Sequence, residues 1–259
     1  MRKITVLAVG DVVGNESVKY VQKHLSGIKK EYNVDFTVLN CENSADSNGV
    51  EIQGAEALFS AGADVLTSGN HIWKRHQIQD YLDDNKNILR PANYPPEAPG
   101  MGHTICEVNG IRILVMNLLG TVYLDPLACP FMTAEKILSR ENGRYDLSIL
   151  DFHAEATSEK LAMAYEFDGR INVIFGTHTH VQTADERIMP KGTGYITDIG
   201  MTGPDNSVLG VCPELIIKKL KTHMPVKFEL AKGDFSLCGA VFEIDADSKR
   251  VISVQRIKK

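Results

Sequence analysis

Residues 171–180 read Ile-Asn-Val-Ile-Phe-Gly-Thr-His-Thr-His, an apolar run followed at once by two histidines. The run 171–175 is rich in β-branched residues, which predicts a buried strand with His178 and His180 just past its carboxyl end. Open α/β sheets keep their functional sites at that edge. Small residues around the pair allow both imidazoles to approach a common point. Two solvated loop histidines would give the same pattern, so the pair alone does not establish a metal site.

The composition describes an ordinary globular protein of 259 residues with a formal net charge of −5. We expect residues 1–259 to form a single α/β domain. Lysines and arginines are scattered and often near acids, which argues against a surface for duplex nucleic acid. The five cysteines form no CxxC pair, which is typical of a reducing cytoplasm. The apolar run 4–9 ends too early for a secretion signal, and no later run is long enough to span a membrane.

Three earlier strands are each expected to end in polar residues that can bind a cation. The predicted strands span 4–9, 36–40 and 64–67, and the predicted helices span about 16–32, 52–61 and 77–84. The polar residues that follow the strands are, in chain order, Asp11, Glu42, Asn43, Asn70 and His71. Because the carboxyl ends of parallel strands meet at one edge, we expect these side chains to lie near the histidine pair.

The second half of the chain predicts another sheet. It begins with a hairpin over 103–119, which turns at Asn109-Gly110. A strand over 147–150 then ends in Asp151-Phe152-His153, which adds a third histidine at a strand end. The other predicted elements are a loop over 124–132, helices over 134–140, 159–167 and 214–221, and an antiparallel edge made by 237–244 and 251–257.

Together these polar residues mix hard oxygen donors with imidazoles, which suits iron, manganese or zinc better than calcium or magnesium alone. The side chain of Cys41 is expected to point away from Glu42, and the cysteines supply no ligand set for a structural zinc. Taken singly, Asp11 fits a turn or a helix cap, and His153 fits a hydrogen-bonded structural histidine. Glu42 is harder to explain, because a carboxylate directly after an apolar strand is costly unless it is paired, solvated or ligating.

The order of the motifs resembles the calcineurin-like metallophosphoesterase superfamily over residues 10–180. The motifs are Gly-Asp-x-x-Gly at 10–14, the acid Glu42, Gly-Asn-His at 69–71, the lone His153, and Gly-x-His-x-His at 176–180. Each motif alone is weak, but Gly-Asn-His and Gly-x-His-x-His in this order are specific together.

Two departures from the common superfamily pattern are visible. The usual Asp-x-His of the first motif has Val13 in place of the histidine, and the usual Gly-Asp of the second motif is replaced by Cys41-Glu42-Asn43. These departures, together with the stretches 90–95, 151–155 and 199–204, resemble the YmdB-like branch of the superfamily. The match then covers most of the chain.

The resemblance implies a four-layer α/β/β/α sandwich, in which two mixed β-sheets face each other with helices outside. It also implies two metal ions, iron or manganese with zinc as an alternative, and Glu42 as the carboxylate that bridges them. The implied further ligands are Asp11, Asn43 and His180 at the first ion, and Asn70, His153 and His178 at the second. Asn43 would then compensate for the histidine missing at Val13.

The implied activity is hydrolysis of 2′,3′-cyclic nucleotides to 3′-nucleotides by in-line attack of a metal-bridging hydroxide. His71 follows the ligand Asn70 directly, so it can face the substrate and act as general acid without binding the ions. Hydrogen bonds that orient the imidazoles are expected from Thr157, Asp151 or Asp198.

Two other functions are compatible with the residues. A phosphomonoesterase would need extra cationic residues for a dianion, and none is evident near the motifs. A slow, metal-bound nucleotide sensor would have no need of a proton donor, so His71 favours an enzyme. The expected partner is a small phosphodiester such as a cyclic nucleotide, with no membrane and no duplex nucleic acid. The resemblance is compatible with a homo-oligomer. The pattern of surface residues does not indicate an oligomeric state.

Overall fold

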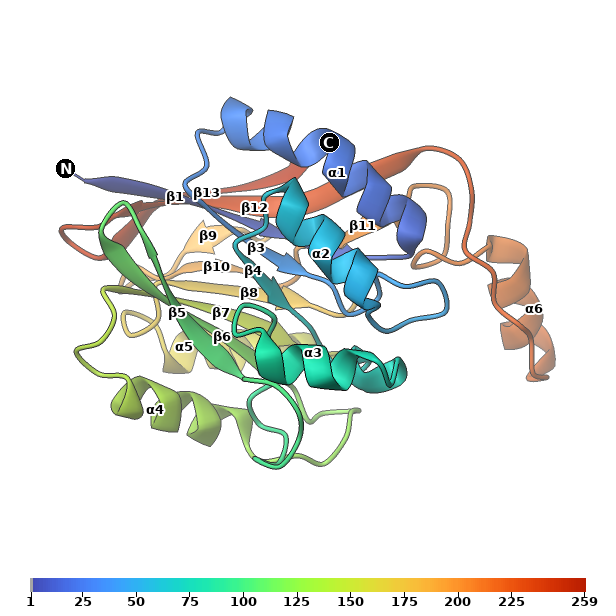
Figure 1. Ribbon diagram of the computed structural model, residues 1–259, viewed down its shortest axis with the longest axis horizontal. Coiled ribbons are helices and arrows are strands. Elements are labelled where there is room, and N and C mark those ends of the chain that lie inside the picture. Colours follow the sequence, from blue (N-terminus) through green and yellow to red (C-terminus); the bar gives the residue numbers. More distant parts are fainter. Residues whose placement is uncertain (1) are drawn as a thin grey trace.

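The computed structural model describes residues 2–259, which fold into two β-sheets stacked face to face with helices on both outer faces (Figure 1). This is the expected four-layer α/β/β/α sandwich with two mixed sheets. Three apolar layers hold the four layers of structure together, one beneath each set of helices and one between the sheets.

The first sheet has seven strands within the described residues. Its order is β2-β11-β12-β1-β3-β4, and β13 pairs with β12 as well. The strands are β1 (Lys3–Val9), β2 (Asp11–Val12), β3 (Phe36–Asn40), β4 (Val65–Thr67), β11 (Met201–Pro204), β12 (Phe235–Asp245) and β13 (Arg250–Lys258). β1, β3 and β4 are parallel neighbours, so their carboxyl ends lie at one edge.

The second sheet has six strands in the same part of the chain, in the order β5-β6-β7-β8-β10-β9. They are β5 (His103–Val108), β6 (Ile111–Leu119), β7 (Leu147–His153), β8 (Val173–Thr177), β9 (Arg187–Ile188) and β10 (Gly194–Ile196). β6, β7 and β8 are parallel, so this sheet also gathers strand ends at one edge. The Asn109-Gly110 turn joins β5 to β6, and the prediction that a second sheet begins at this hairpin is confirmed.

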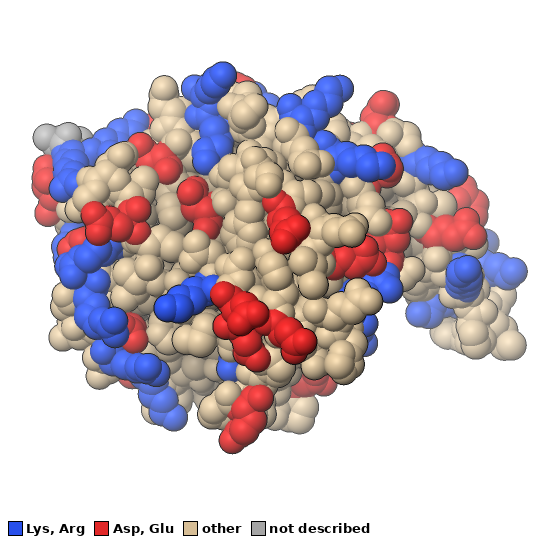
Figure 2. Space-filling view, viewed as in Figure 1, with Lys and Arg blue, Asp and Glu red and all other residues tan. Residues whose placement is uncertain are grey.

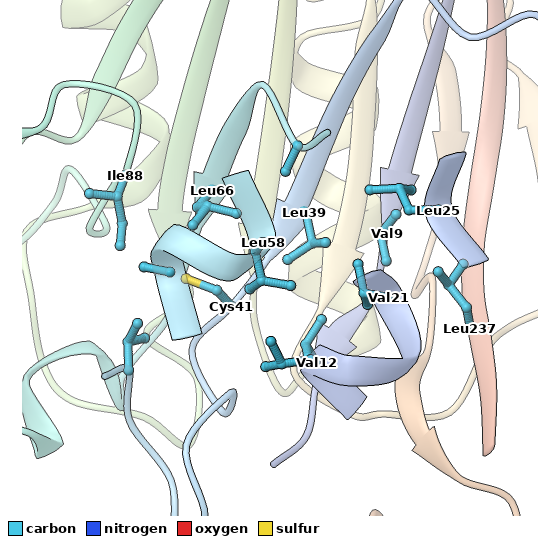
Figure 3. Packing of buried hydrophobic residues seen from close by; sticks show 14 of the residues in the cluster. Val9, Val12, Val21, Leu25, Leu39, Cys41, Leu58, Leu66, Ile88 and Leu237 are labelled. Carbon is cyan, nitrogen blue, oxygen red and sulfur yellow. The ribbon is translucent and has the colours of Figure 1, made fainter. Parts of the chain in front are cut away.

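Helices cover the outer faces of both sheets. The helices of the described residues are α1 (Asn15–Glu31), α2 (Ile52–Ala61), α3 (Ile78–Asp84), α4 (Pro130–Arg140), α5 (Thr157–Glu166) and α6 (Pro213–Thr222), with a 3₁₀ turn η1 at Ile72–Lys74. α6 is the exception, because it has no buried residue and covers neither sheet (Figure 1). α1 and α2 pack on the first sheet, where Val21 and Leu25 of α1 and Leu58 of α2 meet Val9 and Leu39 of the strands (Figure 3). α4 and α5 cover the second sheet.

Alternation along the strands decides which apolar layer each residue joins. In β1, Leu7 and Val9 point to the helices, whereas Val6 and Ala8 point to the other sheet. Cys41 joins the layer beneath α1 and α2, which confirms that its side chain points away from the candidate site. Burial on both faces explains why these strands read as nearly continuous apolar runs in the sequence.

Several bounds differ from the sequence predictions. β7 runs to His153 and not to residue 150, because residues 151–153 continue to pair with β8. β8 begins and ends two residues later than predicted, because Gly176 and Thr177 continue to pair with β7. α4 begins at Pro130, which takes the first helical position, within the predicted loop 124–132. β12 lies between β1 and β13, so only β13 is an edge strand of the predicted antiparallel pair.

Candidate metal centre

The polar residues that follow the strands converge where the carboxyl ends of the two sheets face each other. The residues that the sequence pattern selected are Asp11, Glu42, Asn43, Asn70, His71, His153, His178 and His180, and contacts join all of them except Asn70 to another member. Asn70 follows Gly69, where an added Cβ would meet the side chains of Glu42 and His153. The structure therefore brings the whole predicted set to one place.

Glu42 lies in the middle of this cluster and is only 1% exposed. Its Oε1 atom is 3.3 Å from Nε2 of His153 and 3.2 Å from Nδ1 of His71. Its Oε2 atom accepts a hydrogen bond from the backbone N–H of His71. Burial raises the pKa of the Glu42 carboxyl, but His153 and His71 outweigh burial and hold that pKa well below its usual range. Glu42 is therefore ionised at neutral pH although it is buried.

Three histidines each place one ring nitrogen within hydrogen-bond distance of a neighbouring oxygen. The pairs are His153 Nδ1 with Thr177 Oγ1 at 2.8 Å, His178 Nε2 with Glu155 Oε2 at 3.1 Å, and His180 Nδ1 with the backbone oxygen of Leu209 at 3.1 Å. The other nitrogens face the cluster: His178 Nδ1 is 3.0 Å from His153 Nε2, and His180 Nε2 is 3.7 Å from Asp11 Oδ1. Proteins orient metal-binding histidines in this way, by a hydrogen bond from the ring nitrogen that does not ligate.

Glu42, His153 and His178 each offer one ligand atom, and these atoms lie within 4.8 Å of one another. Burial lowers the pKa of His153, but Glu42 and Asp11 outweigh it and raise that pKa to about 9. Burial and the neighbouring His153 lower the pKa of His178 to about 3. Two facing imidazoles thus share at most one proton, and a metal ion can take the place of that proton between them.

Two buried oxygens at the site have no hydrogen-bond donor among residues 2–259. They are Oδ1 of Asp11 and Oδ1 of Asn70. A buried acceptor without a donor costs about 1–3 kcal/mol, so a cation is the natural partner for both. The carboxylates, amide oxygen and imidazoles together fit the iron, manganese or zinc that the donor types suggest.

Asn43 is placed beside the cluster with its amide nitrogen inward. Its Nδ2 atom donates to Oε1 of Glu42 and lies 3.3 Å from Nε2 of His180, while its Oδ1 atom is 3.1 Å from Nδ1 of His71. Ligation of a metal by Asn43 therefore requires the amide to turn over, which would bring Oδ1 to face Glu42 and His180.

Gly69 keeps open the space between the ligand atoms. A Cβ at this position would lie 2.3 Å from Nε2 of His153 and 2.4 Å from Oε2 of Glu42, far inside van der Waals contact. We predict that Gly69→Ala loses metal binding, because the methyl group occupies the position between the two ligands. We also expect a loss of about 1–3 kcal/mol in the free energy of unfolding of the metal-free protein. Metal analysis and urea unfolding measure the two effects, and full metal occupancy in the variant would contradict the first.

Asp151 holds the histidine at the end of β7 through an intermediate hydroxyl. Thr177 Oγ1 donates to Asp151 Oδ1 at 2.7 Å and in turn accepts from Nδ1 of His153. The other carboxylate oxygen accepts from Asn40 and Thr67. Burial raises the pKa of Asp151 to about 6, while these donors favour its ionised form. The predicted orienting role of Asp151 therefore has a direct structural basis, acting on His153 through Thr177.

Replacing this carboxylate tests the hydroxyl relay. Asp151→Asn replaces one of the two carboxylate oxygens by an amide N–H₂, and Asn40 and Thr67 donate to one of these oxygens whereas Thr177 donates to the other. With the N–H₂ on the side of Thr177, the relay loses its acceptor and His153 loses its fixed orientation. We expect metal affinity to fall by about 10–100-fold, as for other residues that orient metal-binding histidines. The metal affinity of the variant is measured by letting the protein compete with a metal-binding dye for the ion. An affinity equal to that of the unchanged protein would remove Asp151 from the orienting network.

The turn that carries the last two histidines has an unusual backbone. His178 and His180 have φ angles of +100° and +63°, which non-glycine residues rarely adopt and which cost about 1–3 kcal/mol each. Asp198 holds this turn by accepting from the backbone N–H and the hydroxyl of Thr179, and it pairs with the buried Lys160 at 2.8 Å. Asp198 thus orients the turn, not an imidazole directly. Thr157 begins α5 and makes no hydrogen bond to an imidazole among the described residues.

Sequence reasoning did not single out Glu155 or Thr177, although both contact the candidate ligands. Glu155 lies two residues after His153 and has a half-exposed carboxylate next to His178. Two signals were available: its position on the short loop between β7 and α5, and its place in the stretch 151–155 that resembles the YmdB-like branch. Thr177 was read only as a small residue that gives the histidines room, and its hydroxyl instead links His153 to Asp151.

Comparison with known proteins finds close relatives across the chain. The sequence profile of a family described as YmdB-like protein matches residues 7–257. A protein of Bacillus subtilis named 2′,3′-cyclic-nucleotide 2′-phosphodiesterase is 45% identical over 252 residues, which cover 97% of this chain and 96% of that protein.

Solved structures agree with the fold. A structure described as a novel phosphatase from Mycoplasma pneumoniae superposes with a TM-score of 0.94 at 36% identity, covering 100% of this chain and 94% of that one. A putative 5′-nucleotidase from Staphylococcus aureus superposes with a TM-score of 0.62 at 14% identity, covering 99% of this chain and 54% of that one, which shows a shared fold alone. None of the helices within residues 2–259 is long and apolar enough to cross a membrane.

Proposed function

The chain belongs to the YmdB-like protein family, and on that premise we propose that it is a metal-dependent phosphodiesterase that opens 2′,3′-cyclic nucleotides to 3′-nucleotides. The observation that carries the proposal is the orientation of the three imidazoles. Each of His153, His178 and His180 donates its outer ring N–H to an oxygen and turns its other nitrogen toward the cluster around Glu42. A centre of this kind is built to hold metal ions, and the activity named for the Bacillus relative fits it.

The proposed ligands divide into two groups around Glu42. Asp11, His180 and Asn43 lie together on one side, with 3.7 Å between Asp11 Oδ1 and His180 Nε2. His153 and His178 lie on the other side. Asn70 is the third proposed ligand of this second group, through its buried Oδ1 atom, which has no hydrogen-bond partner within residues 2–259. When bound, a metal pair supplies a nucleophile at neutral pH and neutralises charge on the phosphoryl oxygens. We expect both metal positions to contain iron or manganese.

His71 is the residue that we propose to protonate the leaving oxygen. Its Nδ1 atom contacts Asn43 and Glu42, which fixes the ring, while Nε2 has no hydrogen-bond partner within residues 2–259. The side chain is 24% exposed, so the free nitrogen can reach a bound substrate. As the bond from phosphorus to the 2′ oxygen breaks, Nε2–H donates its proton to that oxygen, and the phosphate remains on the 3′ oxygen.

A phosphomonoesterase is the main alternative, and the charge distribution disfavours it. A phosphomonoester carries an additional negative charge that enzymes commonly meet with arginine or lysine. Among the described residues no lysine or arginine forms an ion pair with Asp11 or Glu42, and the nearby Lys160 is committed to Asp198. The site is therefore better matched to a diester, which has a single negative charge.

The test is a comparison of three substrates after metal removal and reconstitution with Mn²⁺ or Fe²⁺. We expect metal-dependent hydrolysis of 2′,3′-cyclic AMP to 3′-AMP, with much slower hydrolysis of 3′-AMP itself and of 4-nitrophenyl phosphate. Chromatography separates 3′-AMP from 2′-AMP and so identifies the bond that breaks. Faster turnover of the monoesters would support the phosphomonoesterase, and tight metal binding without turnover of any ester would support a nucleotide sensor.

A further inference from the structure

A pocket lies at the amino ends of β7 and β8, at the edge of the molecule where the turn between β12 and β13 is seen on the left of Figure 1. Four connections line it: those between α4 and β7, α5 and β8, β9 and β10, and β12 and β13. The metal centre lies at the carboxyl ends of the same strands. The seven residues of β7, at a rise of about 3.3 Å each, place about 20 Å between the two. The pocket is therefore separate from the metal centre.

Hydrogen bonds between the connections hold the pocket in shape. Nδ2 of Asn172 donates to the backbone oxygen of Lys249 at 2.6 Å, which ties the connection before β8 to the turn between β12 and β13. The backbone N–H of Val251 donates to the backbone oxygen of Gly192 at 3.0 Å, which ties that turn to the connection before β10. The pocket has a volume of about 490 Å³, and sites for small molecules usually measure about 300–1,000 Å³. It is thus preformed and large enough for a small ligand.

The walls of the pocket carry four cations and one acid. The cations are Arg170, Lys191, Lys249 and Arg250. The acid, Asp146, is paired with Arg112 at 3.0 Å, and Arg170 is paired with Glu135 at 2.7 Å. Within residues 2–259 the other three cations form no ion pair with a carboxylate. Figure 2 shows basic side chains gathered along this edge. Three positive charges are thus left without a partner in a chain whose net charge is −5.

Two glycines with positive φ give room to two of these three cations. Gly169 has a φ of +79°, and a Cβ there would lie 2.8 Å from Cβ of Lys191. Gly192 has a φ of +108°, and a Cβ there would lie 2.8 Å from Nε of Arg250. Each long side chain therefore lies across a glycine backbone beside the pocket. A cation that is already held in place loses less conformational freedom when a ligand binds.

We propose that this pocket binds a phosphate anion that carries two or more negative charges, either free or at the end of a nucleotide. Ammonium and guanidinium groups form short, charge-assisted hydrogen bonds with phosphate oxygens, and three unpaired cations match several negative charges better than one. The partly buried ring of Tyr145 also lines the pocket and offers a flat apolar surface to an attached base. The pocket does not depend on the reaction that the metal centre performs.

The experiment is isothermal titration calorimetry of the whole chain, with ADP and inorganic pyrophosphate as the two probes. The test variant is Lys191→Gln/Arg250→Gln, which removes one cation from a connection of each sheet and leaves the backbone hydrogen bonds in place. The matched control is Lys23→Gln/Lys30→Gln, which makes the same change in net charge at two exposed lysines of α1. A second series in the Glu42→Gln background removes any contribution of the metal centre, and circular dichroism checks the fold of each variant.

We expect one probe molecule per chain, a dissociation constant raised about tenfold or more in the test variant, and little change in the control. The same loss is expected in the Glu42→Gln background. Tighter binding of ADP than of pyrophosphate would support the proposal with a nucleotide as ligand, and equal affinities would support it with a free phosphate anion. The proposal is overturned if the unchanged protein binds neither probe at millimolar concentration, or if the test variant loses no more affinity than the control.

Discussion

Replacing Glu42 by Gln is expected to empty the metal centre and to reduce phosphodiesterase activity by about 10³-fold or more, because a metal pair contributes several kcal/mol to catalysis and each 1.4 kcal/mol is a factor of ten. The reason lies in the position of Glu42 between the two groups of candidate ligands, 3.3 Å from Nε2 of His153. Gln keeps the volume and hydrogen-bonding shape of the side chain but removes the negative charge that two cations would share.

Metal analysis and thermal unfolding separate this effect from a folding defect. Metal stabilises the folded chain by mass action, so a chelator should lower the melting temperature of the unchanged protein but leave that of Glu42→Gln nearly constant. Glu51→Gln is the matched control, because Glu51 is a 43% exposed glutamate that pairs weakly with Arg75 at 3.8 Å. A Glu42→Gln protein with two ions per chain and intact turnover would refute the bridging role.

Local patterns were sufficient to predict the elements that position the site. The strand 36–40 and the helix 52–61 were predicted with the bounds that the structure shows, because an apolar run precedes the acid and Gly62 ends the helix with a φ of +113°. The candidate ligands could be selected for the same reason. Parallel strands that are close in sequence deliver their carboxyl ends to one edge, so polar residues after successive strands meet.

Contacts between distant parts of the chain could not be predicted in this way. β12 pairs with β1 across 230 to 242 residues, from Val9 with Gly239 to Lys3 with Asp245, and nothing local to residues 235–245 indicates that β12 enters the middle of the first sheet. Glu155 contacts His178 across a turn after β8 in which His178 has a positive φ, and the sequence Thr-His-Thr-His does not reveal that conformation. α6 likewise has the amphipathic pattern of a helix that packs on its own domain, yet none of its residues is buried.

The removal of the imidazole at position 71 should separate proton donation from metal binding. His71→Ala is expected to retain both metal ions and the fold, and to lower turnover of 2′,3′-cyclic AMP by about 10²–10⁴-fold. His71 contributes no nitrogen to the group formed by Glu42, His153 and His178, so its loss leaves those ligand atoms in place. His76→Ala is the control, because His76 is an exposed histidine five residues further along the chain.

The leaving group decides whether His71 acts as an acid or only supports Glu42 through its 3.2 Å contact. A sugar hydroxyl is a poor leaving group that needs a proton, whereas 4-nitrophenolate departs without one. If His71 donates the proton at Nε2, the alanine variant should lose far less activity toward bis(4-nitrophenyl) phosphate than toward the cyclic nucleotide. Equal losses on both substrates would instead assign His71 to holding Glu42 in place, since a displaced carboxylate slows every diester alike.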